Sequence, residues 1–272
     1  MATTSDVKVT LYWSALPRIH SKTNRLTLSR LEKSRSQRIL WLLEELNVPY
    51  EVKTFKRGKD MLAPKELREI HPLGKSPVIS VQSSATPKPI VIAESGMIVE
   101  YLCDHFGGDK LIPTRYAEGK EGQIGGETEE WLRYRYYMHF SEGSLMPFLV
   151  FKLVTDTMKS PPGLPFFLRP IPRIVAGQVE QQFVNPNLER TLDFLEDQLK
   201  SAPGGGPFFC GSKVTAADIM MSFPLVAANT RMPLKEKYPR MAAFVEAIEK
   251  QDGYKRAIEK IKEIDGKFEA SL

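Results

Sequence analysis

Three short polar clusters in the first part of the sequence have side chains that could bind or activate a ligand. In the first, Ser34 and Gln37 have the spacing of a capping box, in which the serine hydroxyl accepts a backbone N–H and the glutamine amide reaches back. The same helix start offers free N–H groups and the positive end of the helix dipole, which can hold an anion such as a thiolate. A structural cap and an anion site with a hydroxyl donor are both open interpretations here.

The other two clusters stand next to predicted strands. Ser76-Pro77 follows a turn and opens a strand, so its peptide bond is a candidate for the cis form, although such a sequence more often forms an ordinary trans turn. Glu94 and Ser95 begin a predicted helix. They either cap that helix or recognise an amino group through the carboxylate and a carboxylate through the hydroxyl.

Histidine and cysteine give no sign of other chemistry. The four histidines lack the spacing of a metal site or a catalytic triad: His20, His71, His105 and His139. Cys103 and Cys210 are the only cysteines, and neither lies in the 31–38 segment, which argues against a disulfide scaffold and a cysteine-based redox cycle. We therefore expect no metal, and the absence of a signal-like start leads us to expect a reducing, cytoplasmic location.

Composition narrows the function classes further. The 272 residues are 42% hydrophobic and 26% charged, which is typical of a folded globular protein. The formal charge of +5 is spread along the chain, so no nucleic-acid partner is expected. The longest apolar run, residues 146–154, is interrupted by Lys152 and is far too short to span a membrane.

Hydrophobic periodicity predicts an α/β domain followed by helices. Strands are predicted at 7–13, 25–31, 50–55, 76–81 and 89–92, with helices at 39–46, 64–70 and 94–106. The 39–46 helix forms a β-α-β unit whose strands should be parallel. After Gly107-Gly108 only helical patterns remain, at 127–153 with an interruption at Gly143, and at 173–200, 216–229 and 238–270 with a break at 252–253.

Two features of the second half stand out from this pattern. Residues 159–172 contain five prolines and predict a loop. Thr215 and Asp218 form a second capping box, with Val214 and Ile219 as its hydrophobic staple, which we interpret as a folding element of the helical core. The predicted domains are 1–107 (α/β) and 124–272 (all-α), joined by a linker at 108–123.

Taken together, the clusters resemble the cytosolic glutathione transferases, especially fungal and bacterial members related to the yeast membrane-associated type and, more distantly, the theta class. The resemblance is carried by LEKSRSQRILWLLEELNVPYEV, HPLGKSPVI, IAESGMIVEYL, HFSEGSLMPFLVFKLV and FFCGSKVTAADIMMSFPL. It covers nearly everything from Leu31 onward. It implies a thioredoxin-like domain that binds glutathione as co-substrate and a helical domain that binds a small apolar electrophile.

The resemblance also implies roles for particular residues. Pro77 would be a cis proline, the backbone of Ser76 would pair with the cysteinyl part of glutathione, and Lys75 would approach its glycyl carboxylate. Glu94 and Ser95 would hold the γ-glutamyl end. Ser34 matches the theta-type catalytic serine, with Ser36 as the alternate.

The chemical task of that serine is to keep a thiol ionised. A free thiol has a pKa of about 8.5. Lowering it by roughly 1.5 units requires about 2 kcal/mol of preferential stabilisation of the thiolate. One charge-assisted hydrogen bond, worth about 1.5 to 3 kcal/mol, together with a helix-dipole contribution of about 0.3 to 1 kcal/mol, is sufficient without a general base.

The second substrate would lie against the helix that contains Tyr134, Tyr137 and Met138, although plain core packing explains such a stripe more often. The apolar residues Phe148, Phe151 and 166–168 would line the same pocket, or form a patch for dimerisation or for attachment to a membrane surface such as that of the endoplasmic reticulum. We expect a homodimer.

Residues 14–30 depart from the family pattern, because family members pass directly from the first strand into the 31–38 segment. Either 25–31 replaces 7–13 as the first strand, or the segment bulges beside the glutathione site, or it is translated intron sequence. The predicted function is conjugation of glutathione to apolar electrophiles in detoxification and stress response, with peroxide reduction as a further activity. The alternative is a non-catalytic interaction module with the same fold.

Overall fold

A computed structural model describes residues 8–13, 35–55, 64–82, 88–159, 161, 163–231 and 234–268. Its sheet has four strands in the order β2-β1-β3-β4: β1 (Lys8–Trp13), β2 (Tyr50–Thr54), β3 (Val78–Gln82) and β4 (Ile90–Ala93). β1 runs parallel to β2 and antiparallel to β3, and β4 pairs antiparallel with β3. The parallel β-α-β unit predicted from the sequence is confirmed.

The strand predicted at 7–13 is present as β1, residues 8–13, which pairs with both β2 and β3. The predicted strand at 25–31 and the whole 14–30 segment lie outside the described residues.

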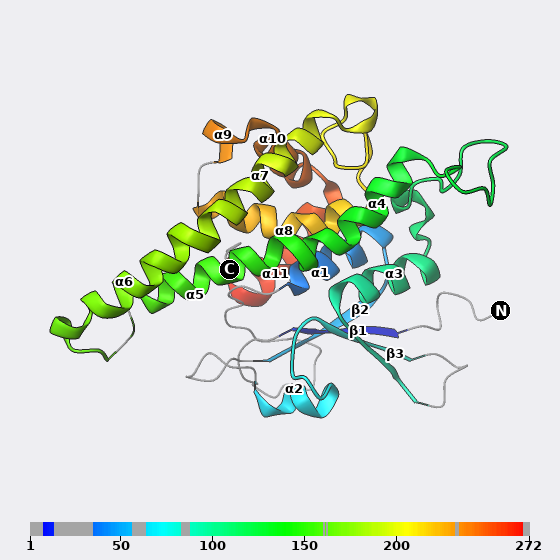
Figure 1. Cartoon of the computed structure of the whole chain (residues 1–272). Coiled ribbons are helices and arrows are strands. Elements are labelled where there is room, and N and C mark those ends of the chain that lie inside the picture. Colours follow the sequence, from blue (N-terminus) through cyan, green and yellow to red (C-terminus); the bar gives the residue numbers. More distant parts are fainter. Residues whose placement is uncertain are drawn as a thin grey trace.

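Three helices cover this sheet. α1 (Ser36–Leu46) and α3 (Ser95–His105) lie on the side of the sheet that faces the helical part of the molecule, and α2 (Lys65–Ile70) lies on the other side (Figure 1). Every residue of α1 from Ser36 to Leu43 is buried, because the sheet packs on one side and helices on the other. α1 ends at Leu46, and its C-terminal cap residue Asn47 adopts the left-handed conformation with φ 53°.

The helical part contains two long helical rods, each with a π-helical turn in the middle. The first rod consists of α4 (Glu129–Phe140), a π-turn (Ser141–Leu145) and α5 (Met146–Met158). The second consists of α6 (Pro170–Val179), a π-turn (Glu180–Val184) and α7 (Asn185–Lys200). The interruption predicted at Gly143 is thus a π-turn through which the helix continues.

The predicted 159–172 loop is shorter than the sequence suggested. A 3₁₀ turn occupies Phe166–Leu168, and α6 begins at Pro170. Proline is well tolerated in the first helical turn, where its missing N–H would have no helical partner.

The remaining helices form the centre and the far end of the helical part. They are α8 (Ala216–Arg231), α9 (Leu234–Lys237), α10 (Pro239–Glu249) and α11 (Asp252–Asp265). α8 is almost entirely buried, and α11 packs against α1. One continuous apolar core therefore joins the sheet side of the molecule to the helices. In the part of the chain that the structure describes, no helix is both long and apolar enough to cross a bilayer.

The predicted capping box at the start of α8 is confirmed. The Asp218 carboxylate accepts the backbone N–H of Thr215 at 2.8 Å and the Thr215 hydroxyl at 2.7 Å. Its other oxygen accepts the Phe209 N–H at 2.9 Å. Burial raises the pKa of Asp218 to about 6, against the opposing effect of these hydrogen bonds.

Candidate active site

A small cleft lies where the start of α1, the turn before β3, the junction of β4 with α3 and the π-turn after α4 come together. Its volume is about 60 Å³. All five residues predicted to bind glutathione line it, and the full lining is Arg35, His71, Leu73, Lys75, Ser76, Pro77, Ala93, Glu94, Ser95 and Glu142. The fold thus brings together two sequence clusters that are separated by a hairpin.

The backbone of this cleft has two special conformations. The Ser76–Pro77 peptide bond is cis, as the sequence indicated it could be. Glu94 has φ 69°, which is rare for a residue with a side chain and is often found at functional sites. Glu94 serves as the N-terminal cap residue of α3 without a side-chain capping bond, so the carboxylate does not have the structural role that was the alternative to ligand recognition.

α1 begins at Ser36, and its cap residue Arg35 makes no side-chain capping bond. The Gln37 amide donates to the Tyr254 hydroxyl at 3.3 Å. The predicted capping box of Ser34 and Gln37 stays a prediction. Ser34 lies outside the described residues, and its predicted catalytic role stays a prediction.

Ser36, the alternate catalytic serine, is fully buried in the first turn of α1. Its hydroxyl lies 2.8 Å from that of Ser76. This bond ties the start of α1 to the cis-proline turn. Ser36 therefore has a visible positioning role at the edge of the cleft.

Two arginines and a glutamate at the same edge were missed by the sequence analysis. The fully buried Arg38 donates from Nη1 to the Ser141 hydroxyl at 3.2 Å and the Met220 carbonyl at 2.9 Å, and from Nη2 to Glu142. Arg35 Nε lies 3.4 Å from the other oxygen of Glu142. Burial lowers the pKa of Arg38, and Glu142 opposes that effect. With two cations and one anion, the cluster adds positive charge beside the amino end of α1.

The three residues predicted for the second-substrate pocket lie elsewhere. Tyr134, Tyr137 and Met138 are buried in the core, and none of them lines the cleft. The ring centroids of Tyr137 and Phe209 lie 4.4 Å apart. The Tyr137 hydroxyl donates to the Gln198 amide oxygen at 3.2 Å. Burial raises the pKa of both tyrosines. The structure therefore places this stripe in core packing, the alternative considered for it.

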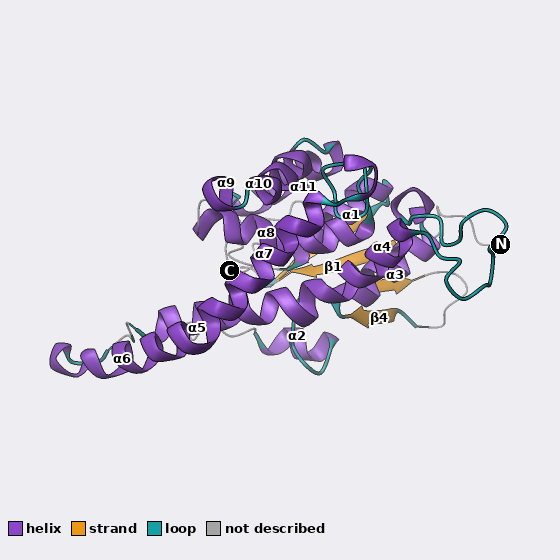
Figure 2. Ribbon diagram, turned by 45° about the horizontal axis from the view of Figure 1, so that its top comes forward, coloured by secondary structure: helices purple, strands orange, loops and turns teal. Residues whose placement is uncertain are grey.

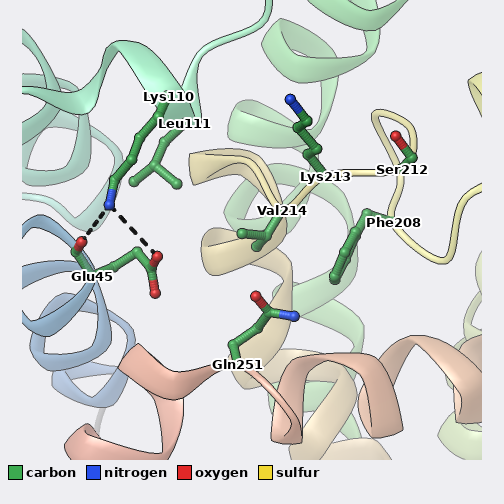
Figure 3. Close-up of a pocket in the computed structure, with 8 residues that line it drawn as sticks. All are labelled: Glu45, Lys110, Leu111, Phe208, Ser212, Lys213, Val214 and Gln251. Carbon is green, nitrogen blue, oxygen red and sulfur yellow. Dashed lines mark hydrogen bonds and ion pairs between the residues drawn. The ribbon is translucent and has the colours of Figure 1, made fainter.

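A larger cavity of about 330 Å³ lies near the other end of α1, where the helix meets the Phe208–Val214 segment and the start of α11 (Figure 3). Lys110 points toward Glu45 there, with Nζ 2.8 Å from the Glu45 carbonyl and 3.8 Å from its carboxylate. None of the predicted site residues lines this cavity.

The two cysteines and the metal-ligating side chains of the described residues do not form a second candidate site. Burial raises the pKa of the Cys103 thiol to about 12 and also raises that of Cys210, so neither is a thiolate at neutral pH. Within the described ranges, no group of three or more histidine, cysteine or acidic residues is placed to hold a metal ion.

The fold joins a thioredoxin-like sheet domain to a helical second half, and comparison with known proteins agrees. The model of the glutathione S-transferase N-terminal domain matches residues 34–105, and that of the C-terminal domain matches residues 177–247. The chain belongs to the glutathione S-transferase family.

Two curated relatives and one solved structure illustrate the similarity. The chain is 33% identical to glutathione S-transferase 1 of Saccharomyces cerevisiae over 239 residues, or 88% of this chain and 96% of that protein. It is 31% identical to glutathione S-transferase 3 of Schizosaccharomyces pombe, over 88% of each. A glutathione transferase homologue from Lodderomyces elongisporus, solved with two glutathione molecules per subunit, matches with a TM-score of 0.63 and 16% identity, covering 93% of this chain and 98% of that one.

Proposed function

We propose that this glutathione transferase joins the thiolate of glutathione to small apolar electrophiles. The observation that carries the proposal is the convergence of the α1 start, the cis Ser76–Pro77 turn and the Glu94-Ser95 pair on one cleft. Glutathione has two carboxylates and one ammonium group, and Lys75, Glu94 and Ser95 supply matching charges and a hydroxyl. A solved homologue of the same fold holds glutathione.

In the proposed reaction the sulfur binds near the amino end of α1. Free N–H groups of the first turn and the net positive charge of the Arg35–Glu142–Arg38 cluster stabilise the thiolate. A serine hydroxyl, from Ser34 with Ser36 as the alternate, donates a hydrogen bond to the sulfur. The thiol proton leaves to solvent, the sulfur attacks the electrophilic carbon, and the leaving group departs with its electron pair.

The test separates the two serines. Because a charge-assisted hydrogen bond is worth about 1.5 to 3 kcal/mol, Ser34→Ala should lower kcat with a chromogenic aryl halide by roughly 10- to 100-fold at neutral pH. Its KM for glutathione should change much less. Ser36→Ala should mainly weaken glutathione binding, because the bond to Ser76 is lost.

Ser212→Ala, an exposed serine at the other cavity, is the matched control and should leave both constants unchanged. If calorimetry detects no glutathione binding to the folded chain, the non-catalytic module becomes the correct function. If neither Ser34→Ala nor Ser36→Ala changes turnover, the serine mechanism fails while binding stands.

The remaining expectations are part of the proposal. Peroxide reduction would consume two glutathione molecules per peroxide and yield the disulfide, an alcohol and water. A role in detoxification and stress response fits either reaction. The buried, unpaired thiols of Cys103 and Cys210 are consistent with a reducing cytoplasm.

A homodimer is proposed on the basis of an exposed apolar surface on two neighbouring helices. The Arg135–Glu100 ion pair, at 2.6 Å, joins α4 to α3. The same two helices carry the exposed side chains of Met97, Leu132 and Tyr136. A second copy could cover these side chains, and the mass of the chain in solution tests that directly.

A further inference from the structure

Arg35 is a cation of the cleft that the binding of glutathione does not use. The proposed function assigns Lys75 to the glycyl carboxylate, and Glu94 and Ser95 to the γ-glutamyl end. Of the residues that line the cleft, Arg35 and Lys75 are the two that carry a permanent positive charge. The Arg35 guanidinium is therefore the cation that is left for the second substrate.

Arg35 also stands where the reaction would take place. It is the N-terminal cap residue of α1, the helix end at which the proposed function places the sulfur. Arg35 and Ser76 line the same cleft of about 60 Å³, so a sulfur held beside Ser76 would lie near the Arg35 guanidinium. A second substrate that reaches the sulfur would reach this guanidinium as well.

Two linked ion pairs with the helical half hold Arg35 in place. Glu142 has one carboxylate oxygen 3.4 Å from Arg35 Nε and pairs with Arg38 through the other. Figures 1 and 2 show the rod of α4 and α5 crossing the molecule, and the π-turn that contains Glu142 joins these two labelled helices. The side chains of Arg35, Glu142 and Arg38 are 37%, 32% and 0% exposed. The linked pairs are therefore anchored in the core at Arg38 and end at the cleft with Arg35.

The Arg35 guanidinium has hydrogen-bond donors to spare. It donates no hydrogen bond to a described residue, and its contact with Glu142 is an ion pair at Nε. Arg38, by contrast, uses both of its Nη atoms. Among the lining residues only Glu142 comes from the helical half, so no apolar side chain of α4 lines the cleft beside the guanidinium. A planar guanidinium with free N–H groups is well suited to bind an oxygen atom that carries negative charge.

We propose that Arg35 is a catalytic residue that activates the electrophile, because it binds an oxygen on which negative charge develops during the attack. The substrates that benefit are conjugated carbonyl compounds, such as enals and enones. The thiolate forms a bond to the β-carbon, the electron pair of the C=C bond moves to give an enolate, and Arg35 donates to the enolate oxygen. The α-carbon then takes a proton from water, which balances the thiol proton released to solvent. The inference rests on the proposed function and adds a residue that acts on the second substrate.

The test compares two small electrophiles, trans-2-hexenal, which has the carbonyl oxygen, and benzyl chloride, which has none. Both are attacked by the same sulfur, so the ratio of their kcat/KM values cancels any effect of a variant on the thiolate. Arg35→Met should lower the hexenal to benzyl chloride ratio by roughly 100-fold, because losing one donor to a developing oxyanion costs about 10²- to 10³-fold in kcat. Arg35→Lys keeps the charge but not the planar donors, and should lower the ratio by roughly tenfold.

Arg190→Met makes the same change at an exposed arginine of α7 and is the matched control, which should leave the ratio unchanged. Circular dichroism and retention on immobilised glutathione establish that each variant is folded and binds glutathione. The proposal is overturned, and the proposed function stands, if Arg35→Met lowers both rates by the same factor or lowers neither. The same holds if the unmodified chain converts benzyl chloride but not hexenal. If the unmodified chain converts neither electrophile, the proposed function and the role of Arg35 both fall.

Discussion

The carboxylate of Glu142 contacts one arginine that lines the cleft and another that is fully buried. Removing its charge leaves the Arg38 guanidinium buried without an anionic partner, which is costly. Because Glu142 itself is partly exposed, we expect Glu142→Gln to lower the free energy of unfolding by about 2 kcal/mol. Urea denaturation measures this change. Glu118→Gln, on the exposed loop before α4, should leave it unaltered, and equal effects of the two variants would contradict the assignment.

Asp218 accepts three hydrogen bonds inside the helical core. The Asp218→Ala variant would leave two backbone N–H groups and one hydroxyl without acceptors. At about 1 to 3 kcal/mol for each buried unsatisfied group, we expect a loss of at least 3 kcal/mol in the free energy of unfolding. Thermal unfolding monitored by circular dichroism tests this. A variant as stable as the unmodified chain would show that the capping box does not stabilise the fold.

Sequence reasoning succeeded at this scale where a residue's role is local. The Thr215–Asp218 box depends on neighbours within a few positions. The residues around Ser76–Pro77 favoured an ordinary trans turn, and the cis bond was implied only by the family resemblance. It missed Arg38, because the partners of Arg38 come from a π-turn and from α8, more than 100 residues away. A stripe such as Tyr134, Tyr137 and Met138 shows that one helix face is covered, but not whether protein or a substrate covers it.

At the scale of elements, the contact between the second π-turn and α5 should respond to acid, because the buried Glu180 carries it. Burial alone would raise the pKa of Glu180, but hydrogen bonds from Lys159, Thr155 and Lys152 outweigh it and lower the pKa to about 2. The unfolded chain has a pKa of about 4.3 at such a group. The folded state therefore binds this proton less tightly, so the contribution of Glu180 to stability is full above about pH 5 and is lost as the pH falls toward 2.

Comparison of the unmodified chain with Glu180→Gln measures this contribution. The difference in their free energies of unfolding should be constant between pH 5 and 7 and shrink as the pH falls below about 4.5. Glu189→Gln, an exposed partner of Lys237, serves as the control and should show a smaller difference. A difference that grows in acid would contradict the lowered pKa.

Most elements were predictable because the period of their hydrophobic residues is local. β2, α2, β4 and α3 begin and end within a residue or two of their predicted limits. The start of α6 was not predictable, because five prolines within 159–172 argued for a loop through Pro172. Proline disfavours a helix interior but suits its first turn, and only the three-dimensional structure shows which position each proline takes.

On the scale of the whole molecule, the two halves should unfold together. The core is continuous from the sheet side to α10 and α11. The Tyr254 ring of α11 meets Trp41 of α1 edge to face with centroids 5.3 Å apart, and its hydroxyl accepts the Gln37 amide. Tryptophan fluorescence and far-ultraviolet circular dichroism should therefore follow one coincident transition.

Tyr254→Ala tests this coupling. Truncation of a buried aromatic side chain should lower the free energy of unfolding by about 3 kcal/mol and still leave a single transition. Tyr116→Ala, at a partly exposed tyrosine before α4, should cost much less. Two separated transitions in either probe would show that the halves are independent.

The π-turn after α4 has a mechanical consequence. Glu142, at the cleft, and Met146, the first residue of α5, belong to one uninterrupted helical rod that continues to Met158. A rod transmits tilt along its length. A shift of the far end of α5 would therefore also change the angle at which Glu142 meets its two arginines.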